Sequence, residues 1–280
     1  MRRIKNHTTY KLEYIKKYIE AYLSATKKLK EKYYIDAFAG SGKCLLCNDK
    51  CKSSGGKRCY ICGRGEVVNG SVFISLKCKN IFNKYLFIDK DKKCVEEIKK
   101  LILKDTDIGE EVKKRIEIKQ GDSNLLLDDE FSKSIDYYTG CLILLDPEGP
   151  ELSWNIIKSL SVIKKLDLLI LYPYDMALVR MMNKKYKERI NNFYGSTEWQ
   201  IIRNKKISPQ MKKEEILNLY IGSLRKIGFE YVVYRQIQRG YRTGKSLYHL
   251  ILATHYNIGE KIMKDIFDKE IDGQKKFKFK

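Results

Sequence analysis

Four aspartates follow short apolar segments of this sequence, and their placement is the first indication of chemistry. Asp36 ends the segment KYYID, Asp89 ends YLFID, Asp122 follows RIEIKQG, and Asp146 follows CLILL. Such apolar runs, rich in aromatic and β-branched residues, are typical of buried strands. Because the carboxyl ends of parallel strands lie at one edge of a sheet, the four carboxylates are predicted to line one ligand site. A single aspartate after a strand is most often a turn residue, so the prediction depends on all four together.

The first of these segments runs into the turn DAFAGSG, whose glycines let the backbone approach a ligand closely. The turn lacks the third glycine of the dinucleotide fingerprint and the Lys-Ser/Thr pair of a phosphate loop, and it therefore favours S-adenosylmethionine. Asp36 is expected to face the amino-acid part of this cofactor, Asp89 its ribose hydroxyls and Asp122 its adenine amine. The predicted cofactor-binding residues are Asp36, Phe38, Ala39, Gly40, Gly42, Asp89 and Asp122.

The fourth apolar segment ends in a second candidate site with the sequence DPEG. Amino-group methyltransferases have a D/N-P-P-Y/F motif at this place, where the acid and a nearby carbonyl accept hydrogen bonds from the target amine. Asp146 and Pro147 match this motif, whereas the second proline and the aromatic residue are absent. Glu148 is therefore an alternative base for a different acceptor, and Tyr172 and Tyr174 are expected to supply the stacking face. The simpler alternative is a rigid loop after a core strand.

Five of the eight cysteines lie between positions 44 and 62. Two CxxC pairs in this segment predict a tetrahedral zinc site with the ligands Cys44, Cys47, Cys59 and Cys62, and Cys51 could replace one of them. An iron–sulfur cluster also takes four thiolates, and a disulfide or a catalytic thiol are further alternatives. The segment is rich in lysine and arginine, so it is either a basic module that holds nucleic acid or a metal staple in a long loop.

The chain is strongly basic, with 56 Lys and Arg against 35 Asp and Glu and a formal net charge of +21. This balance favours a polyanionic partner, most simply DNA or RNA, although a lysine-rich genome would also raise the charge. No apolar run approaches the roughly 18 residues that span a bilayer, and the amphipathic N-terminus does not resemble a signal peptide. We therefore expect a cytoplasmic protein without a membrane partner.

The elements that must position these residues alternate between strands and helices, which predicts an α/β, Rossmann-like fold with a mostly parallel central sheet. A last pair of strands is expected to form an antiparallel edge hairpin. One domain is expected over 1–280, with a cysteine-rich insertion at 43–65 and a helical segment at 176–227. Helices are expected at 8–28, 71–79, 91–103, 154–163, 176–193 and 208–227, and strands at 33–38, 85–89, 115–122, 141–149, 166–174, 229–237 and 246–255.

Several segments in this order resemble the three-Cys-motif partner protein (TcmP) family of class I methyltransferase-like proteins. They are TTYKLEYIKKYIEAYL, YIDAFAGSG, GEVVNGSVFISL, FIDKD, LLDPEGPELSW and LLILYPYDMALVR, and the resemblance covers about residues 8–255. It implies a class I methyltransferase fold, S-adenosylmethionine binding and a separate partner protein that bears three cysteines.

The sequence as a whole predicts methyl transfer from S-adenosylmethionine to nucleic acid, with Asp146 orienting the acceptor, which could be a base amino group. One alternative is a catalytically inactive nucleic-acid-binding protein that keeps the fold. Another is a methylase for a protein or a small product of the associated three-Cys system.

Overall fold

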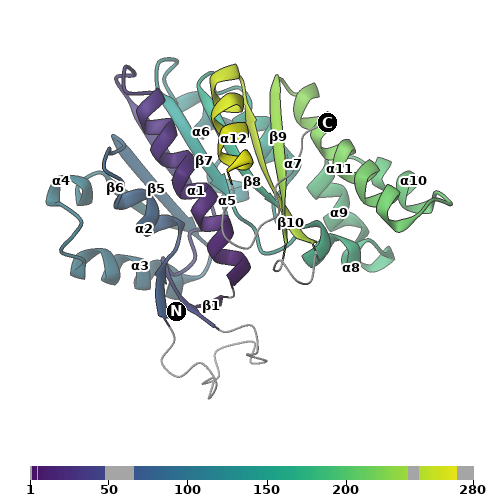
Figure 1. The fold of residues 1–280 in the computed structure, drawn as a ribbon, viewed down its shortest axis with the longest axis horizontal. Coiled ribbons are helices and arrows are strands. Elements are labelled where there is room, and N and C mark those ends of the chain that lie inside the picture. The colour runs from purple at the N-terminus through teal and green to yellow at the C-terminus, as the bar shows by residue number, and fades with distance from the viewer. Residues whose placement is uncertain (1, 5, 48–65, 239–245, 270–280) are drawn as a thin grey trace.

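The structure is a computed structural model of the 280-residue chain, and it describes residues 2–4, 6–47, 66–238 and 246–269. Its centre is a seven-stranded sheet with the order β6-β5-β2-β7-β8-β10-β9 (Figure 1). These strands are β2 (Lys32–Asp36), β5 (Lys84–Asp89), β6 (Ile116–Gln120), β7 (Gly140–Leu145), β8 (Leu166–Tyr172), β9 (Tyr231–Gln238) and β10 (Ser246–Thr254). The first five in sequence are parallel, and β10 runs antiparallel between β8 and the edge strand β9, so the predicted edge hairpin is confirmed.

The central strands are buried on both faces, as expected of a parallel sheet covered on both sides. All six residues of β7 are buried. Leu142 and Leu144 pack into the core on one face of the sheet, and Ile143 and Leu145 pack into the core on the other. Because both faces of β7 are buried, β7 is an unbroken apolar run in the sequence.

One face of the sheet is covered by α1 and α12, with helices α2 and α3 farther along (Figure 1). Helix α1 buries Tyr14, Ile15, Tyr18 and Ile19 against the strands. Helix α12 packs against α1 and β9, and the sequence analysis did not predict it. The bounds on this side of the sheet are α1 (Asn6–Ala25), α2 (Ser71–Leu76), α3 (Lys92–Lys104), α4 (Glu110–Lys113) and α12 (Asn257–Asp268).

The other face is covered mainly by α7, α9 and α11. The single helix predicted over 176–193 is wrong, because the side chain of Asn183 accepts a hydrogen bond from the Lys185 N–H and starts a new turn there. The predicted break at Gly195 is confirmed by its positive φ of 63°. The elements are α5 (Ser123–Leu126), α6 (Asp129–Ser134), α7 (Trp154–Leu160), a π-helix (Tyr174–Leu178), α8 (Val179–Met181), a 3-10 helix (Lys184–Tyr186), α9 (Lys187–Tyr194), α10 (Glu198–Asn204) and α11 (Pro209–Lys226). Among the described helices, none combines the length and apolar character needed to cross a membrane.

A second sheet of three short strands lies beside the N-terminus (Figure 1). Its strands are β1 (Arg2–Ile4), β3 (Lys43–Leu46) and β4 (Glu66–Asn69), with β1 parallel and β4 antiparallel to β3. The sequence predicted a loop over 43–65, and this is wrong at 43–46. Strand β3 pairs with the start of the chain and with a segment beyond position 65, so no short-range pattern shows it. Residues 48–65 lie outside the described part of the chain.

Candidate functional site

The four predicted acids stand at the carboxyl ends of four neighbouring parallel strands. Asp36 is the last residue of β2 and Asp89 the last of β5, while Asp122 follows β6 by two residues and Asp146 follows β7 directly. Because β6, β5, β2 and β7 are adjacent and parallel, these four residues share one edge of the sheet. That edge is where open α/β sheets bind their ligands.

A cavity of about 710 Å³ lies over this edge, and we call it the larger cavity. Four of the predicted cofactor-binding residues line it, namely Phe38, Gly40, Asp89 and Asp122. The further lining residues include Ser41, Lys90, Asp91, Cys94, Glu97, Gly121, Asn124, Asp146, Glu148, Pro150, Glu151, Arg189 and Asn192. Its volume lies within the range of about 300–1,000 Å³ that is typical of sites for small ligands.

Hydrogen bonds to the backbone hold the acids of the larger cavity in place. The Asp89 carboxylate accepts from the Gly40 N–H at 2.8 Å and from the Asp91 N–H at 2.8 Å. The bond from Gly40 ties the glycine turn after β2 to the end of β5, and the bond from Asp91 fixes the Asp89 side chain within its own loop. Asp122 caps α5 by accepting from the Asn124 N–H at 2.8 Å. The acids that could hold a ligand in this cavity are therefore fixed before a ligand arrives.

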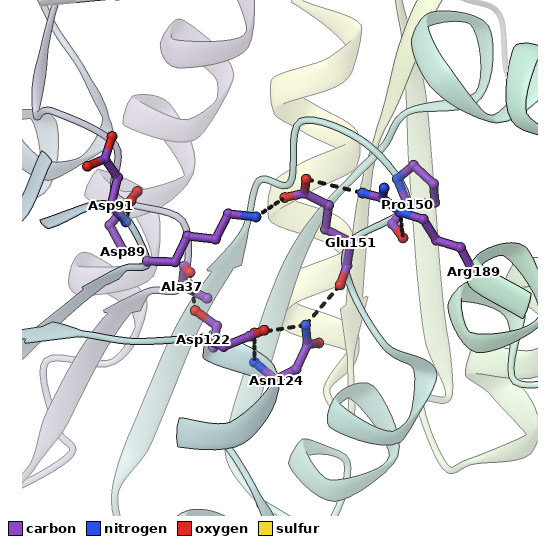
Figure 2. A network of polar contacts seen from close by, with 10 residues as sticks. Ala37, Asp89, Asp91, Asp122, Asn124, Pro150, Glu151 and Arg189 are labelled. Carbon is purple, nitrogen blue, oxygen red and sulfur yellow. Dashed lines mark hydrogen bonds and ion pairs between the residues drawn. The ribbon is translucent and has the colours of Figure 1, made fainter. Parts of the chain in front are cut away.

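A polar network that the sequence analysis missed closes one side of the larger cavity (Figure 2). The Asn124 side chain donates to Asp122 at 3.0 Å and to the Glu151 carbonyl at 2.9 Å. Figure 2 shows the Glu151 carboxylate turned toward Arg189, whose guanidinium approaches it at 3.2 Å. Lys90 reaches the same carboxylate at 3.4 Å. The spacing of Asp122 and Asn124 was a usable sequence signal, whereas Glu151 and Arg189 meet only in the folded chain.

A second cavity, of about 320 Å³, lies on the side of helix α1, and we call it the smaller cavity. Three of the residues predicted to bind the cofactor or the acceptor, Ala39, Gly42 and Pro147, line this cavity and not the larger one. Its other walls are Ile4, Thr8, Lys11, Leu12, Cys44, Gly70, Ser71, Leu171, Pro173 and Tyr248. None of the predicted site residues lies on α1 or β10, which supply Thr8, Lys11, Leu12 and Tyr248 to this wall.

The two cavities share part of their walls. Phe38, Gly40, Ser41, Asp146 and Glu148 line both of them. The glycine turn after β2 and the DPEG segment after β7 therefore form the common boundary of the two cavities. A group held in one cavity and a group held in the other would meet beside Asp146.

Lys11 forms an ion pair with Asp146 inside the smaller cavity. The Lys11 Nζ donates to Asp146 Oδ2, and the Lys11 side chain is only 11% exposed. On helix α1, Lys11 lies four and seven residues before Ile15 and Tyr18, so it occupies the apolar stripe that faces the sheet. A lysine on the buried stripe of a helix requires a partner, and this position was the signal in the sequence that could have found it.

Asp36 lies beneath the shared wall and lines neither cavity. It is fully buried, and its Oδ1 accepts from the Phe38 N–H at 3.2 Å. Burial raises the pKa of Asp36 to about 7, and the nearby Asp146 carboxylate adds to this rise. Asp36 would therefore act on a cofactor indirectly, because it positions the first residues of the glycine turn.

Tyr172 was predicted to face the acceptor, and the structure places it elsewhere. It is fully buried and lines neither cavity. Its hydroxyl lies 2.5 Å from that of Tyr194, and its ring stacks on Tyr174 at 6.2 Å and contacts Tyr220 at 4.9 Å. Burial raises the pKa of Tyr172 well above its ordinary value. Tyr172 therefore belongs to an aromatic core behind the sheet edge, because the last residue of β8 points into the helical layer.

The described cysteines of the predicted zinc site do not converge. Cys44 lies within β3 opposite Val68 and lines the smaller cavity, while Cys47 follows β3 and is buried. The Cys47 N–H donates to the Ile4 carbonyl at 2.7 Å, so the chain remains extended between the two thiols. Residues three apart on an extended chain point to opposite faces, which does not fit the turn of a zinc-binding CxxC pair. Cys51, Cys59 and Cys62 lie outside the described residues, and the described ones hold no cluster suited to a metal ion.

The chain matches no family model and no curated protein. Among solved structures it is similar to a protein from Legionella pneumophila strain Philadelphia 1, with 12% identity, a TM-score of 0.50, and coverage of 90% of this chain and 88% of that one. It is also similar to the methyltransferase domain of a bacterial Hen1 protein, with 13% identity, a TM-score of 0.41 and coverage of 85% and 98%. A further similar structure is an rRNA methylase from Streptococcus thermophilus, with 12% identity, a TM-score of 0.41 and coverage of 86% and 94%.

At these levels of identity the similarity concerns the fold alone. Counted along the chain, the central strands have the order 3-2-1-4-5-7-6, which is the Rossmann order with an antiparallel strand inserted beside the last one. The chain therefore has a Rossmann-like α/β fold with a mostly parallel sheet and an antiparallel edge pair, as predicted from the sequence.

Proposed function

We propose that this protein is an S-adenosylmethionine-dependent methyltransferase that binds its cofactor in the larger cavity and its acceptor in the smaller one. The observation that carries this proposal is that two cavities at the ligand-binding edge of the sheet meet beside Asp146. The larger cavity has the acids to hold an adenosyl group, since Asp89 and Asp122 lie in its wall at the ends of adjacent strands. Phe38 and Gly40 would lie between the cofactor and the acceptor.

S-adenosylmethionine supplies a methyl group on a sulfonium, and the sulfur keeps the bonding electron pair when the methyl group leaves. Asp146 would accept a hydrogen bond from the acceptor nitrogen and so direct the nitrogen lone pair toward the larger cavity. The methylated nitrogen sheds one proton, which Asp146 can accept and pass to solvent because its side chain is 20% exposed. Glu148 lines both cavities and is the second candidate for this proton.

Titration calorimetry with S-adenosylmethionine and with its demethylated product tests the cofactor part of the proposal. Both ligands should bind, and Asp89→Ala should weaken binding by at least tenfold because it removes the acceptor for the Gly40 N–H as well as the predicted ribose contact. Asp129→Ala is the matched control, since Asp129 is an exposed residue of α6 that lines neither cavity. No heat from either ligand would contradict the proposal and leave the nucleic-acid-binding alternative.

We propose nucleic acid as the acceptor, and the net charge of +21 supports this assignment. Single-stranded RNA and DNA should bind with an affinity that falls steeply as salt increases, which a gel-shift series at several salt concentrations measures. Methyl transfer from labelled cofactor should follow, and Asp146→Asn should abolish transfer while leaving cofactor binding within about threefold. Transfer to a protein or a small molecule instead would favour the second class predicted from the sequence, a methylase that serves the three-Cys partner system.

We further propose that the cysteine-rich segment binds zinc with Cys47, Cys51, Cys59 and Cys62 as ligands. The extended geometry between Cys44 and Cys47 supports the replacement of Cys44 by Cys51. Metal analysis of the purified protein should give one zinc per chain, retained in Cys44→Ser and lost in Cys51→Ser. The reverse result would contradict the ligand assignment, and iron in place of zinc would indicate an iron–sulfur cluster.

A further inference from the structure

The ion pair in the smaller cavity requires an explanation beyond stability. Taking Lys11 and Asp146 out of water costs free energy that their attraction only partly offsets, so a buried pair contributes little to folding. Both residues line a cavity, and their side chains are 11% and 20% exposed. A buried ion pair that faces an open cavity is available to a ligand.

The pair offers one hydrogen-bond acceptor and one donor side by side. Lys11 Nζ donates to Asp146 Oδ2, and no hydrogen bond from another described residue reaches Asp146 Oδ1. A carboxylate has lone pairs on both oxygens, and an ammonium carries three N–H groups, of which this contact uses one. Oδ1 can therefore accept from a ligand while Lys11 donates to an adjacent atom of the same ligand. The ion pair also fixes the orientation in which Asp146 presents Oδ1.

An amino-substituted nitrogen heterocycle has the complementary edge. Its exocyclic amine donates, and the neighbouring ring nitrogen accepts, as on the Watson–Crick edges of adenine and cytosine. Uracil and thymine have no exocyclic amine. A volume of about 320 Å³ is at the lower end of ligand sites, and it suits a single ring system and not a base pair. A base would therefore enter from single-stranded or extruded nucleic acid.

We propose that Lys11 is a specificity-determining residue, which donates a hydrogen bond to the ring nitrogen of an aminated base while Asp146 accepts from its exocyclic amine. This inference rests on the proposed methyl transfer in the same site and names its acceptor class. Methyl transfer forms the bond between the amine nitrogen and the methyl carbon and breaks the sulfur–carbon bond. The nitrogen then loses a proton to Asp146, while Lys11 keeps its own protons throughout.

The test measures methyl transfer from labelled S-adenosylmethionine to short single-stranded oligonucleotides that differ at one base. The central base is adenine, 1-deazaadenine, cytosine, 3-deazacytosine or uracil, and the enzymes are the full chain, Lys11→Met and Lys11→Arg. The wild-type protein should methylate adenine or cytosine and leave uracil unmodified. Replacing the ring nitrogen by carbon breaks the two-point contact and should lower kcat/KM by roughly 5- to 150-fold, which corresponds to the about 1–3 kcal/mol of discrimination from a bidentate base contact.

The two variants separate recognition from a merely structural role. Lys11→Met should lose activity on the natural base and respond equally to the natural and deaza bases, whereas Lys11→Arg should keep the preference. A deaza penalty that is the same in the wild type and Lys11→Met would overturn the inference, as would methylation of uracil. If Lys11→Met fails to fold, the absence of a deaza penalty in the wild type is by itself sufficient to overturn it.

The outcomes also distinguish this inference from the function on which it rests. Calorimetry with S-adenosylmethionine on the same preparations reports cofactor binding separately. Transfer to a base without a deaza penalty overturns the role of Lys11 and leaves the methyltransferase proposal intact. Cofactor binding without transfer to any of the five bases overturns this inference together with the nucleic-acid acceptor.

Discussion

The two cavities differ in how far apart in the chain their contacts lie. In the larger cavity Asp89 and Asp122 each accept a hydrogen bond from a backbone N–H two residues farther on. In the smaller cavity Lys11 and Asp146 meet across 135 residues. The two acids at the strand ends of the larger cavity are therefore held partly by their own loops, and the contact from Lys90 to Glu151 in this wall spans 61 residues. The wall of the smaller cavity exists only once α1 has packed on the sheet.

The cavities also differ in how their charges are solvated. Lys90, Asp91 and Asp122 line the larger cavity as exposed residues. Beside the smaller cavity, Lys11 and Asp146 are mostly buried and Asp36 is fully buried beneath them. Electrostatic interactions are stronger where water is excluded, so the acceptor side should dominate the pH dependence and the effects of charge substitutions.

The largest expected effect comes from Asp36. Its pKa of about 7 in the folded protein lies above the ordinary value of 3.8, so between these values the folded state binds more protons than the unfolded state. The free energy of unfolding therefore falls as pH rises through this window, and ionised Asp36 costs stability above pH 7. Asp36→Asn cannot ionise and should not show this decline. The difference between the two proteins should change by roughly 3 kcal/mol between pH 5 and pH 8 in favour of the variant.

Urea unfolding of both proteins at a series of pH values measures this difference directly. Other groups titrate in both proteins, so the subtraction isolates Asp36. Parallel curves for the wild type and Asp36→Asn would show that the carboxyl is solvated in the folded state. This result would contradict the difference in solvation between the smaller cavity, which is proposed for the acceptor, and the larger cavity, which is proposed for the cofactor.

The same distinction explains what the sequence could predict. The mostly parallel sheet, the edge hairpin and the four acids could be predicted from apolar runs bounded by turn residues, because each strand carries its own burial pattern. Lys11 and Tyr248 could not be assigned in this way, since their cavity is assembled from α1, β10 and the DPEG segment. Tyr172 was assigned to the site because it ends a strand, but the alternation of β8 turns it into the helical core. Helix α12, which was not predicted, packs on α1 and β9.

The glycine turn offers a matched pair of substitutions, and the expected difference in stability between these two variants is smaller than the effect at Asp36. Gly40 and Gly42 both have positive φ, at 59° and 77°, which costs an L-residue about 1–2 kcal/mol. A Cβ at Gly40 meets no atom within 4 Å, whereas one at Gly42 lies 2.8 Å from the buried ring of Phe73. Gly42→Ala should therefore destabilise the protein by roughly 2–4 kcal/mol and Gly40→Ala by about 1 kcal/mol.

Urea unfolding and calorimetry with S-adenosylmethionine on both variants sharpen the comparison of the cavities. Gly40 lines both cavities and donates its N–H to Asp89, so Gly40→Ala should weaken cofactor binding more than its small effect on stability suggests. Gly42 lines the smaller cavity only, so Gly42→Ala should lose stability while the folded fraction keeps its cofactor affinity. Equal losses of affinity in the two variants would mean that the turn acts as one unit and that the cavities are not separable there.

The smallest expected effect concerns the ion pair between Lys90 and Glu151, which links the end of β5 to the loop after β7 across the larger cavity. The Lys90 side chain is 68% exposed, and such pairs contribute about 0–1 kcal/mol to stability. Lys90→Ala should leave the unfolding midpoint nearly unchanged but raise the dissociation rate of S-adenosylmethionine about two- to fivefold, because the pair closes one side of the proposed cofactor site. Lys92→Ala is the control, since Lys92 pairs with Glu96 on the surface of α3 and lines neither cavity. Stopped-flow experiments at low and high salt measure the dissociation rate of S-adenosylmethionine. High salt should remove the difference in this rate between the wild type and Lys90→Ala. Identical dissociation rates at low salt would contradict the proposal that the ion pair closes the cavity.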